Sequence, residues 1–209
     1  MRICSLLPSA TEIAFALGLG DDIVGVTHEC DYPPDARAKP VVVRSLIDPE
    51  HTSREIEEKV GAFLKNNKSL YTIDLECFKA AAPDLILTQD LCDVCALDYH
   101  EIARAAQYLS PKPKIVTLAP RVLADVLNDI GRVGQATGKQ REAETVVREL
   151  RERTEAVRER ASSSAVRPRV ACLEWLEPLY SAGHWVPEMV ALAGGEDGLA
   201  TAGQPSARI

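Results

Sequence analysis

RICSLLPSATEIAFALGLGDDIVGVT (residues 2–27) predicts a strand, a helix and a second strand in direct succession. The apolar runs at its two ends, RICSLL and DIVGVT, have the length and composition of buried strands. Between them, ATEIAFALGLG (residues 10–20) predicts a helix that is closed by glycine, and Ser9 and Glu12 have the spacing of a capping box. A strand–helix–strand unit of this kind indicates a parallel sheet covered by helices.

The same alternation continues as far as residue 120. The runs DLILTQ (residues 84–89) and KIVTLA (residues 114–119) predict two further strands. The amphipathic stretches EIEEKVGAFLKN (residues 55–66) and LECFKAAAP (residues 75–83) predict helices, and the proline ends the second one. Residues 1–120 are therefore expected to form an N-terminal βα lobe with a parallel sheet.

Residues 121–165 form a polar region with helical periodicity and little strand signal. Its second piece, KQREAETVVRELRERTEAVRERAS (residues 139–162), carries one apolar stripe and several pairs of opposite charges four residues apart. At about 1.5 Å per residue this helix is about 36 Å long, the width of a small domain. An amphipathic helix packed on the first sheet and a rigid helix joining two lobes are both consistent with the pattern, and the C-terminal sequence favours the second.

Residues 166–209 begin a second βα lobe. RVACLEW (residues 169–175) predicts a buried strand, and SAGHWVPEMVALAGG (residues 181–195) predicts a helix. About 40 residues are too few for an independent core, so the lobe is expected to be incomplete or completed by strands of a partner in a homodimer. The expected fold is α/β, with two Rossmann-like lobes that contain parallel sheets and are joined by a long backbone α-helix.

Composition excludes some classes of function. The formal net charge is −7, which argues against nucleic acid as a partner because phosphate binding depends on clustered Lys and Arg. No apolar run approaches the roughly 20 residues that span a bilayer, so no membrane insertion is expected. The N-terminus lacks the continuous apolar region of a signal peptide. A cytoplasmic location is expected for the chain as it stands, and an extracytoplasmic one if a signal has been removed.

The candidate ligand-binding residues follow the predicted strands. In an open parallel sheet, ligands bind beyond the carboxyl ends of the strands, where the strand order reverses. Large flat side chains on these segments would suit a large, partly apolar ligand, although the two tryptophans could instead pack the core of the second lobe. The candidates are Ser9, Thr11, His28, Glu29, Tyr32, Cys92, Cys95, Trp175, His184 and Trp185.

The segment LCDVC (residues 91–95) leaves several interpretations open. Cys92 and Cys95 with His28 and Cys30 would form a ligand set that zinc prefers, and would make the chain a cytoplasmic zinc-binding protein or metalloenzyme. A redox pair is the second possibility, and two compact hydrophobic residues that shape a turn are the third. No sequence motif of a serine hydrolase, phosphate loop, dinucleotide site or zinc protease is found, so no catalysis is expected.

Three segments carry a family resemblance: SLLPSATEIAFALGLGDDIVGVTHECDYPP (residues 5–34), LYTIDLECFKAAAPDLILTQ (residues 70–89) and SAGHWVPEMVALAGGED (residues 181–197). They resemble the helical-backbone (class III) substrate-binding proteins of ABC importers, in the branch that binds cobalamin and iron chelates. The resemblance implies that cobalamin or another metal chelate binds in a cleft between the lobes. It also implies an ABC permease as partner and no required cofactor.

The resemblance assigns roles to particular residues. Cobalamin-binding members hold the corrin with aromatic side chains from both lobes, which implies this role for Tyr32 and for Trp175 or Trp185. Members of the family dock on their permease through one glutamate on each lobe, which implies Glu76 for the first lobe and Glu188 for the second.

Overall fold

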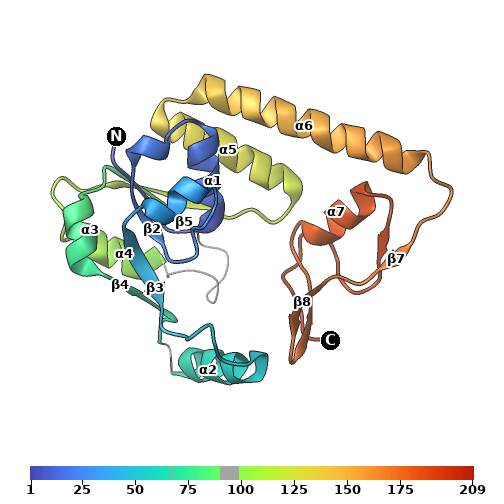
Figure 1. Cartoon of the computed structure of the whole chain (residues 1–209), viewed down its shortest axis with the longest axis horizontal. Helices are drawn as coiled ribbons and strands as arrows, with labels where there is room; N and C mark the ends of the chain where they lie inside the picture. The colour runs from blue at the N-terminus through green and yellow to red at the C-terminus, as the bar shows by residue number, and fades with distance from the viewer. Residues whose placement is uncertain (67, 90–98) are drawn as a thin grey trace.

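The computed structural model describes residues 1–66, 68–89 and 99–209, which form an α/β structure (Figure 1). The main layer is a six-stranded sheet with the order β4-β3-β2-β1-β5-β6. Neighbouring strands are parallel except β3 and β4, which are antiparallel. The strands are β1 (Ile3–Ser5), β2 (Ile23–Thr27), β3 (Val41–Ser45), β4 (Tyr71–Ile73), β5 (Leu85–Gln89) and β6 (Lys114–Leu118). The predicted parallel sheet is confirmed.

The four strands β1, β2, β5 and β6 lie within the runs that the sequence predicts as strands. The sequence patterns above do not predict β3 and β4. Strand β4 is a three-residue edge strand, too short to show alternation, and it forms by pairing with β3, for example Val43 opposite Ile73.

Helices cover both faces of the sheet. The helices are α1 (Pro8–Ala16), α2 (Ser53–Lys65), α3 (Leu75–Ala81), α4 (Tyr99–Ala106), α5 (Leu123–Thr137), α6 (Gln140–Ser162) and α7 (Val186–Leu192). Ile3 and Leu87 pack against α1, α5 and the start of α6, whereas Cys4 and Ile86 pack against α3 and α4. Because successive strand residues point to opposite faces, the uninterrupted apolar runs in β1 and β5 supply both layers of the core.

Helix α1 begins earlier than the sequence predicts. Pro8 is its first residue, Leu7 is the N-cap, and no side chain caps the helix. The predicted capping box of Ser9 and Glu12 is wrong, because proline is well suited to the first position of a helix, which places Ser9 inside the first turn. The predicted glycine closure is confirmed: Gly18 has φ 73°, and its N–H donates to the carbonyl oxygen of Phe15 at 2.9 Å.

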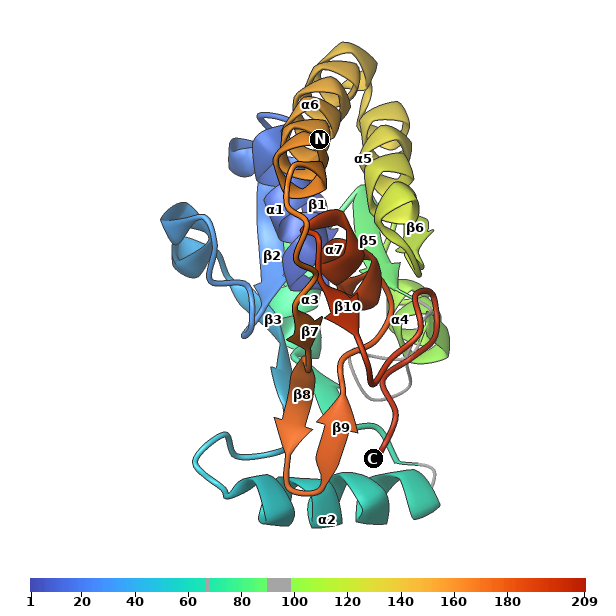
Figure 2. The same ribbon diagram turned by 90° about the vertical axis from the view of Figure 1, so that its right-hand side faces the viewer.

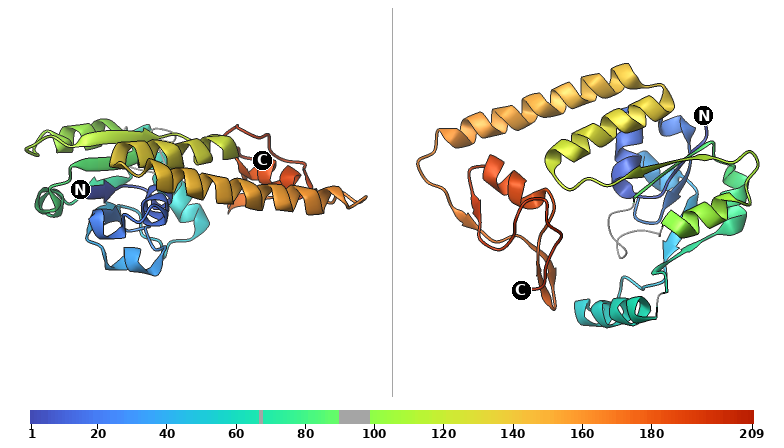
Figure 3. Two further views of the ribbon diagram at one scale, coloured as in Figure 1. Left: turned by 90° about the horizontal axis from the view of Figure 1, so that it is seen from above. Right: turned by 180° about the vertical axis from the view of Figure 1, so that it is seen from behind.

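Helix α6 joins the sheet to residues 166–209, hereafter the C-terminal segment (Figure 3). The first half of the helix packs on α5, where Ala143 is buried. Its last turn meets the C-terminal segment at Gly194, where an added Cβ would lie 3.1 Å from Cβ of Ala161. The helix thus packs on the sheet layer and also bridges to the second lobe, which confirms the predicted backbone helix.

The C-terminal segment contains α7 and two small sheets. Strands β7 (Arg169–Val170) and β10 (Glu196–Asp197) are parallel, whereas β8 (Leu173–Leu176) and β9 (Leu179–Ser181) form an antiparallel hairpin. The predicted buried strand over residues 169–175 is wrong, because the run is split into β7 and β8 and most of its side chains are exposed. The domain limits 1–120, 121–165 and 166–209 stay a prediction.

The contact between α5 and α6 gives a test at two glycines of α5. Gly131→Ala is expected to raise the free energy of unfolding by about 0.5–1 kcal/mol, because an added Cβ meets no atom within 4 Å and alanine favours the helix. Gly134→Ala is expected to lower it by about 1–3 kcal/mol, because its Cβ would lie 2.6 Å from Cβ of Ala143. Urea unfolding measures both, and shifts in the same direction would contradict the described packing.

Candidate functional site

The sheet topology places the candidate site at the carboxyl ends of the central strands. The chain first builds outward from β1 through β2 and β3, and then adds β5 and β6 on the other side of β1. Strand order therefore reverses between β1 and β5, the position where open α/β sheets bind ligands. Residues 6–9 leave β1 and residues 28–33 leave β2 at this end. Cys92 and Cys95 follow β5 but lie outside the described residues, so their roles stay predictions.

A buried polar cluster fixes the loop after β2. The Thr11 hydroxyl donates to Oγ of Ser5 at 2.8 Å, and Sγ of Cys30 lies 3.1 Å from Oγ1 of Thr11 and 3.3 Å from Oγ1 of Thr27. Thr11 is 0% exposed and Cys30 is 4% exposed. Their side chains tie α1 to the ends of β1 and β2, so they position the loop and do not face a ligand. Thr11 is therefore left out of the proposed site.

Three of the predicted ligand-binding residues in this loop are accessible: His28, Glu29 and Tyr32. Nε2 of His28 lies 3.0 Å from Oε1 of Glu29, while its Nδ1 is buried and has no hydrogen-bond partner. Tyr32 is 62% exposed. Ser9 is also exposed, in the first turn of α1. The loop thus presents an imidazole, a carboxylate and an aromatic ring.

The C-terminal segment contributes three further predicted residues. Nε1 of Trp175, in β8, donates to the carbonyl oxygen of Glu177 at 3.0 Å. The backbone N–H of His184 donates to the carbonyl oxygen of Gln204 at 2.6 Å, and the residue has φ 55°. The His184 and Trp185 rings lie 5.9 Å apart, centroid to centroid. Both tryptophans are half-buried, so neither is confined to a core.

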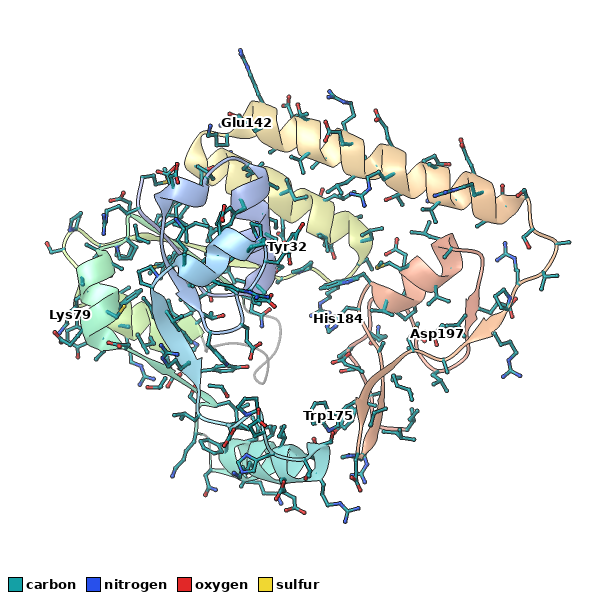
Figure 4. The ribbon with its side chains drawn as sticks, in the orientation of Figure 1. Tyr32, Lys79, Glu142, Trp175, His184 and Asp197 are labelled. Atoms are coloured by element: carbon teal, nitrogen blue, oxygen red, sulfur yellow. The ribbon has the colours of Figure 1, made fainter. Side chains whose placement is uncertain are left out.

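The side-chain view brings residues from the two halves together. Tyr32, Trp175 and His184 lie on the sides of the N-terminal lobe and the C-terminal segment that face each other, whereas Lys79 and Glu142 lie on outer sides (Figure 4). Tyr32 comes from the loop after β2, and the other two come from β8 and the turn before α7. Aromatic and imidazole side chains on facing sides can enclose a large flat ligand.

The expected zinc set is not assembled by the described residues. Among residues 1–66, 68–89 and 99–209, no group of three or more His, Cys, Asp or Glu side chains could hold a metal ion. The Cys30 thiol lies in the core against two threonine hydroxyls, and His28 is paired with Glu29. Cys92 and Cys95, the other two expected zinc ligands, lie outside the described residues.

The two predicted docking glutamates differ in their surroundings. The side chain of Glu76 is 88% exposed at the start of α3 and pairs with Lys79 at 3.2 Å. Glu188 is half-buried, and its carboxylate accepts a hydrogen bond from the backbone N–H of Leu123 at 2.8 Å. Glu188 thereby links α7 to the first turn of α5, and its role in permease docking stays a prediction.

Substitution of Glu188 is expected to destabilise the protein. The carboxylate of Asp125 accepts hydrogen bonds from the backbone N–H groups of Arg121 and Val122, and these bonds lower the pKa of Asp125. The carboxylate of Glu188 accepts a hydrogen bond from the next backbone N–H at the N-terminus of α5. Glu188→Ala should cost about 1–2 kcal/mol of unfolding free energy, and Glu188→Gln less. Thermal unfolding measures both, with Glu76→Ala as the exposed control; equal midpoints for all three would contradict the bond.

A cavity of about 480 Å³ lies between α5, α6 and α7. Its lining combines apolar side chains, such as Leu127 and Leu192, with charged side chains of α6, such as Arg151 and Glu155. No predicted ligand-binding residue lines it. The candidate site therefore rests on the facing side chains and not on this cavity.

A contact that the sequence does not predict joins α2 to the β8–β9 hairpin. Arg54 pairs with Glu177, and the Tyr180 hydroxyl donates to Oε1 of Glu57 at 3.1 Å. Each pair is 123 residues apart in sequence. Pro178 between two apolar runs signals the hairpin turn, but no sequence pattern pairs the turn with α2.

Comparisons with known proteins place the chain in a family. The family described as "Periplasmic binding protein" matches residues 3–209. The vitamin B12-binding proteins of Yersinia pestis (strain Pestoides F) and Yersinia pseudotuberculosis (serotype O:1b, strain IP 31758) are each 26% identical to the chain over 206 residues. These alignments cover 94% of this chain and 59% of the relatives, so the chain spans about 59% of their length.

Solved structures show the same fold. The periplasmic vitamin B12-binding protein BtuF of Vibrio cholerae has a TM-score of 0.68 and 25% identity, with 100% of this chain and 69% of BtuF covered. The periplasmic heme-binding protein RhuT from Roseiflexus sp. RS-1 has a TM-score of 0.71 and 22% identity, with 100% and 70% covered. The similarity to RhuT supports the fold alone. No helix of the described residues is both long and apolar enough to span a bilayer.

Proposed function

Because the chain belongs to the periplasmic binding protein family, we propose that it binds cobalamin or a related metal chelate between its two lobes. The observation that carries the proposal is the position of Tyr32, Trp175 and His184 on facing sides of the two halves. The matched relatives that are named for vitamin B12 support this class of ligand.

The chemistry of the facing residues suits such a ligand. A corrin or porphyrin is a large flat ring system, and Tyr32, Trp175 and Trp185 offer aromatic faces that bury such a surface. His28, Glu29 and His184 add polar groups that could orient its substituents, and imidazole nitrogen is a common metal ligand. Ser9 contributes a hydroxyl at the carboxyl end of β1. Cys92 and Cys95 remain in the proposal as predicted contacts from the segment after β5.

The proposal extends to partners and location. We infer that the chain acts in ABC-type uptake without catalysis, and that Glu76 is the docking residue for a permease because it is highly exposed. The matched solved proteins are described as periplasmic, which supports an extracytoplasmic location. A homodimer that completes the C-terminal lobe stays a prediction, and the mass of the protein in solution would test it.

Fluorescence titration with cobalamin tests the proposal directly. The chain contains two tryptophans, and both are candidate ligand contacts, so quenching reports on the site. We expect saturable quenching and a calorimetric signal at one cobalamin per chain, and a parallel titration with haem would separate the two ligand types. Free tryptophan corrects for light absorption by the ligand. No heat and no quenching beyond this correction, with both ligands at high micromolar concentration, would refute the proposal.

A further inference from the structure

Helix α2 lies apart from the core and reaches the C-terminal segment. None of its residues is buried, so packing does not fix its position on the sheet. Its N-terminal half meets the tip of the β8–β9 hairpin, at the end of the molecule opposite α6 (Figures 1 and 2). The two halves are thus joined covalently through α6 and non-covalently through α2.

Two pairs of side chains form this contact, and in α2 as in the hairpin the two contributing residues are three positions apart. Arg54 and Glu57 are three residues apart, so they lie on the same side of α2. Nε of Arg54 donates to Oε1 of Glu177 at 3.0 Å, and a second guanidinium N–H donates to the same oxygen. The Tyr180 hydroxyl donates to Glu57 at 3.1 Å, and this bond raises the pKa of Tyr180. Glu177 lies in the hairpin turn and Tyr180 lies in β9, so one face of α2 contacts the tip of the hairpin.

The same contact also positions a candidate ligand-binding residue. Trp175 is paired with Tyr180 across the hairpin, and directly paired residues project from the same face of a sheet. The face that carries Tyr180 is turned toward α2, so Trp175 is turned toward the N-terminal lobe as well. Displacement of the hairpin from α2 would therefore move Trp175 away from Tyr32.

We propose that Arg54 with Glu177 and Glu57 with Tyr180 form a latch that holds the two halves together at the end opposite α6 and slows exchange of the ligand. This role in ligand exchange rests on the proposed function. Arg54 and Glu177 are 68% and 51% exposed, so the pair is weak and is screened by salt. A weak contact can hold the ligand-bound arrangement and still open to release the ligand.

Hydrogen exchange tests the latch without ligand. Arg54→Glu is expected to speed amide exchange in the hairpin, residues 173–181, and Glu177→Arg is expected to speed it in α2. The double variant restores opposite charges and should return both segments toward the original rates. The matched control exchanges the charges of Glu155 and Arg158, an exposed pair within α6, and should leave both segments unchanged. If each single variant alters only the segment that carries it, the latch is refuted.

Ligand release tests the consequence. Stopped-flow dissociation of cobalamin is expected to be about two- to fivefold faster in Arg54→Glu and in Tyr180→Phe, and to return toward the original rate in the charge-swapped double variant. High salt should speed release from the unmodified protein and have less effect on Arg54→Glu. Unchanged release rates alongside altered hydrogen exchange would refute the role in ligand exchange. If no form of the protein binds cobalamin or haem, the proposed function fails, while the exchange experiment still decides whether the latch exists.

Discussion

Gly183→Ala is expected to displace the chain around His184 and to lower the free energy of unfolding by about 2–3 kcal/mol. An added Cβ at Gly183 would overlap the backbone nitrogen of Ser206 and would lie 2.8 Å from the carbonyl oxygen of Gln204. Backbone atoms cannot rotate away as a flexible side chain can. The residues around Ser206 must therefore move, and the hydrogen bond between His184 and Gln204 must break.

The expected effect of Gly183→Ala extends to ligand binding, because His184 and Trp185 follow directly. We expect cobalamin affinity to fall at least tenfold, equivalent to about 1.4 kcal/mol. Gly198→Ala is the matched control in the same segment, since its Cβ would meet only the Arg169 guanidinium at 3.8 Å. Urea unfolding and calorimetry measure both variants. Similar stability and affinity for the two would show that the backbone contact at Gly183 does not hold His184 in place.

Trp175→Ala is expected to weaken cobalamin binding by about 10- to 100-fold. Trp175 is half-buried in the free protein, so the ring has surface left to cover a ligand. Its Nε1–H bond to Glu177 fixes the orientation of the ring, which reduces the entropy lost on binding. Trp175→Phe should retain part of the affinity, because it keeps an aromatic face but loses this bond. Calorimetric titration measures the series.

Tyr108→Ala is the control for the loss of an aromatic side chain. Tyr108 is 71% exposed, and it lines a shallow pocket beside β4 and α4, outside the candidate site. Its substitution should leave cobalamin affinity within about twofold, because no candidate ligand-binding residue lines that pocket. Equal affinity of Trp175→Ala and Tyr108→Ala would place the ligand elsewhere on the protein. Thermal unfolding of both variants would separate a loss of folding from a loss of contact.

The location of the candidate site was largely predictable from the chain. Ligand-binding segments follow strands, and the strands β1, β2, β5 and β6 are recognisable as apolar runs. The loop with His28, Glu29 and Tyr32 could therefore be placed at the carboxyl end of the sheet. The directions of the side chains were not predictable. The Cys30 thiol contacts the hydroxyls of Thr11 and Thr27, and these contacts hold Thr11 and Cys30 in the core.

The C-terminal segment shows where pattern reasoning fails. RVACLEW has the composition of a buried strand, but a strand is buried only when other layers cover it. In the structure the run divides into β7 and β8, with Leu173 and Leu176 exposed. In the sequence, Glu188 resembles an ordinary surface glutamate. In the structure its carboxylate caps α5 by accepting a hydrogen bond from the N–H of Leu123, 65 residues earlier in the chain.

Local patterns established the α/β class, the long helix α6 and the βα units, since these depend on periodicity and on end signals within about 25 consecutive residues. The side-chain contacts between the N-terminal lobe and the C-terminal segment could be identified only from the tertiary structure. Arg54 meets Glu177, and Glu57 meets Tyr180, across 123 residues. No local signal encodes such a pairing, because it arises from the combined geometry of the sheet, α6 and the hairpin. The physical reason is that short-range conformational preferences act within each segment, whereas packing and hydrogen bonds between segments fix their relative positions.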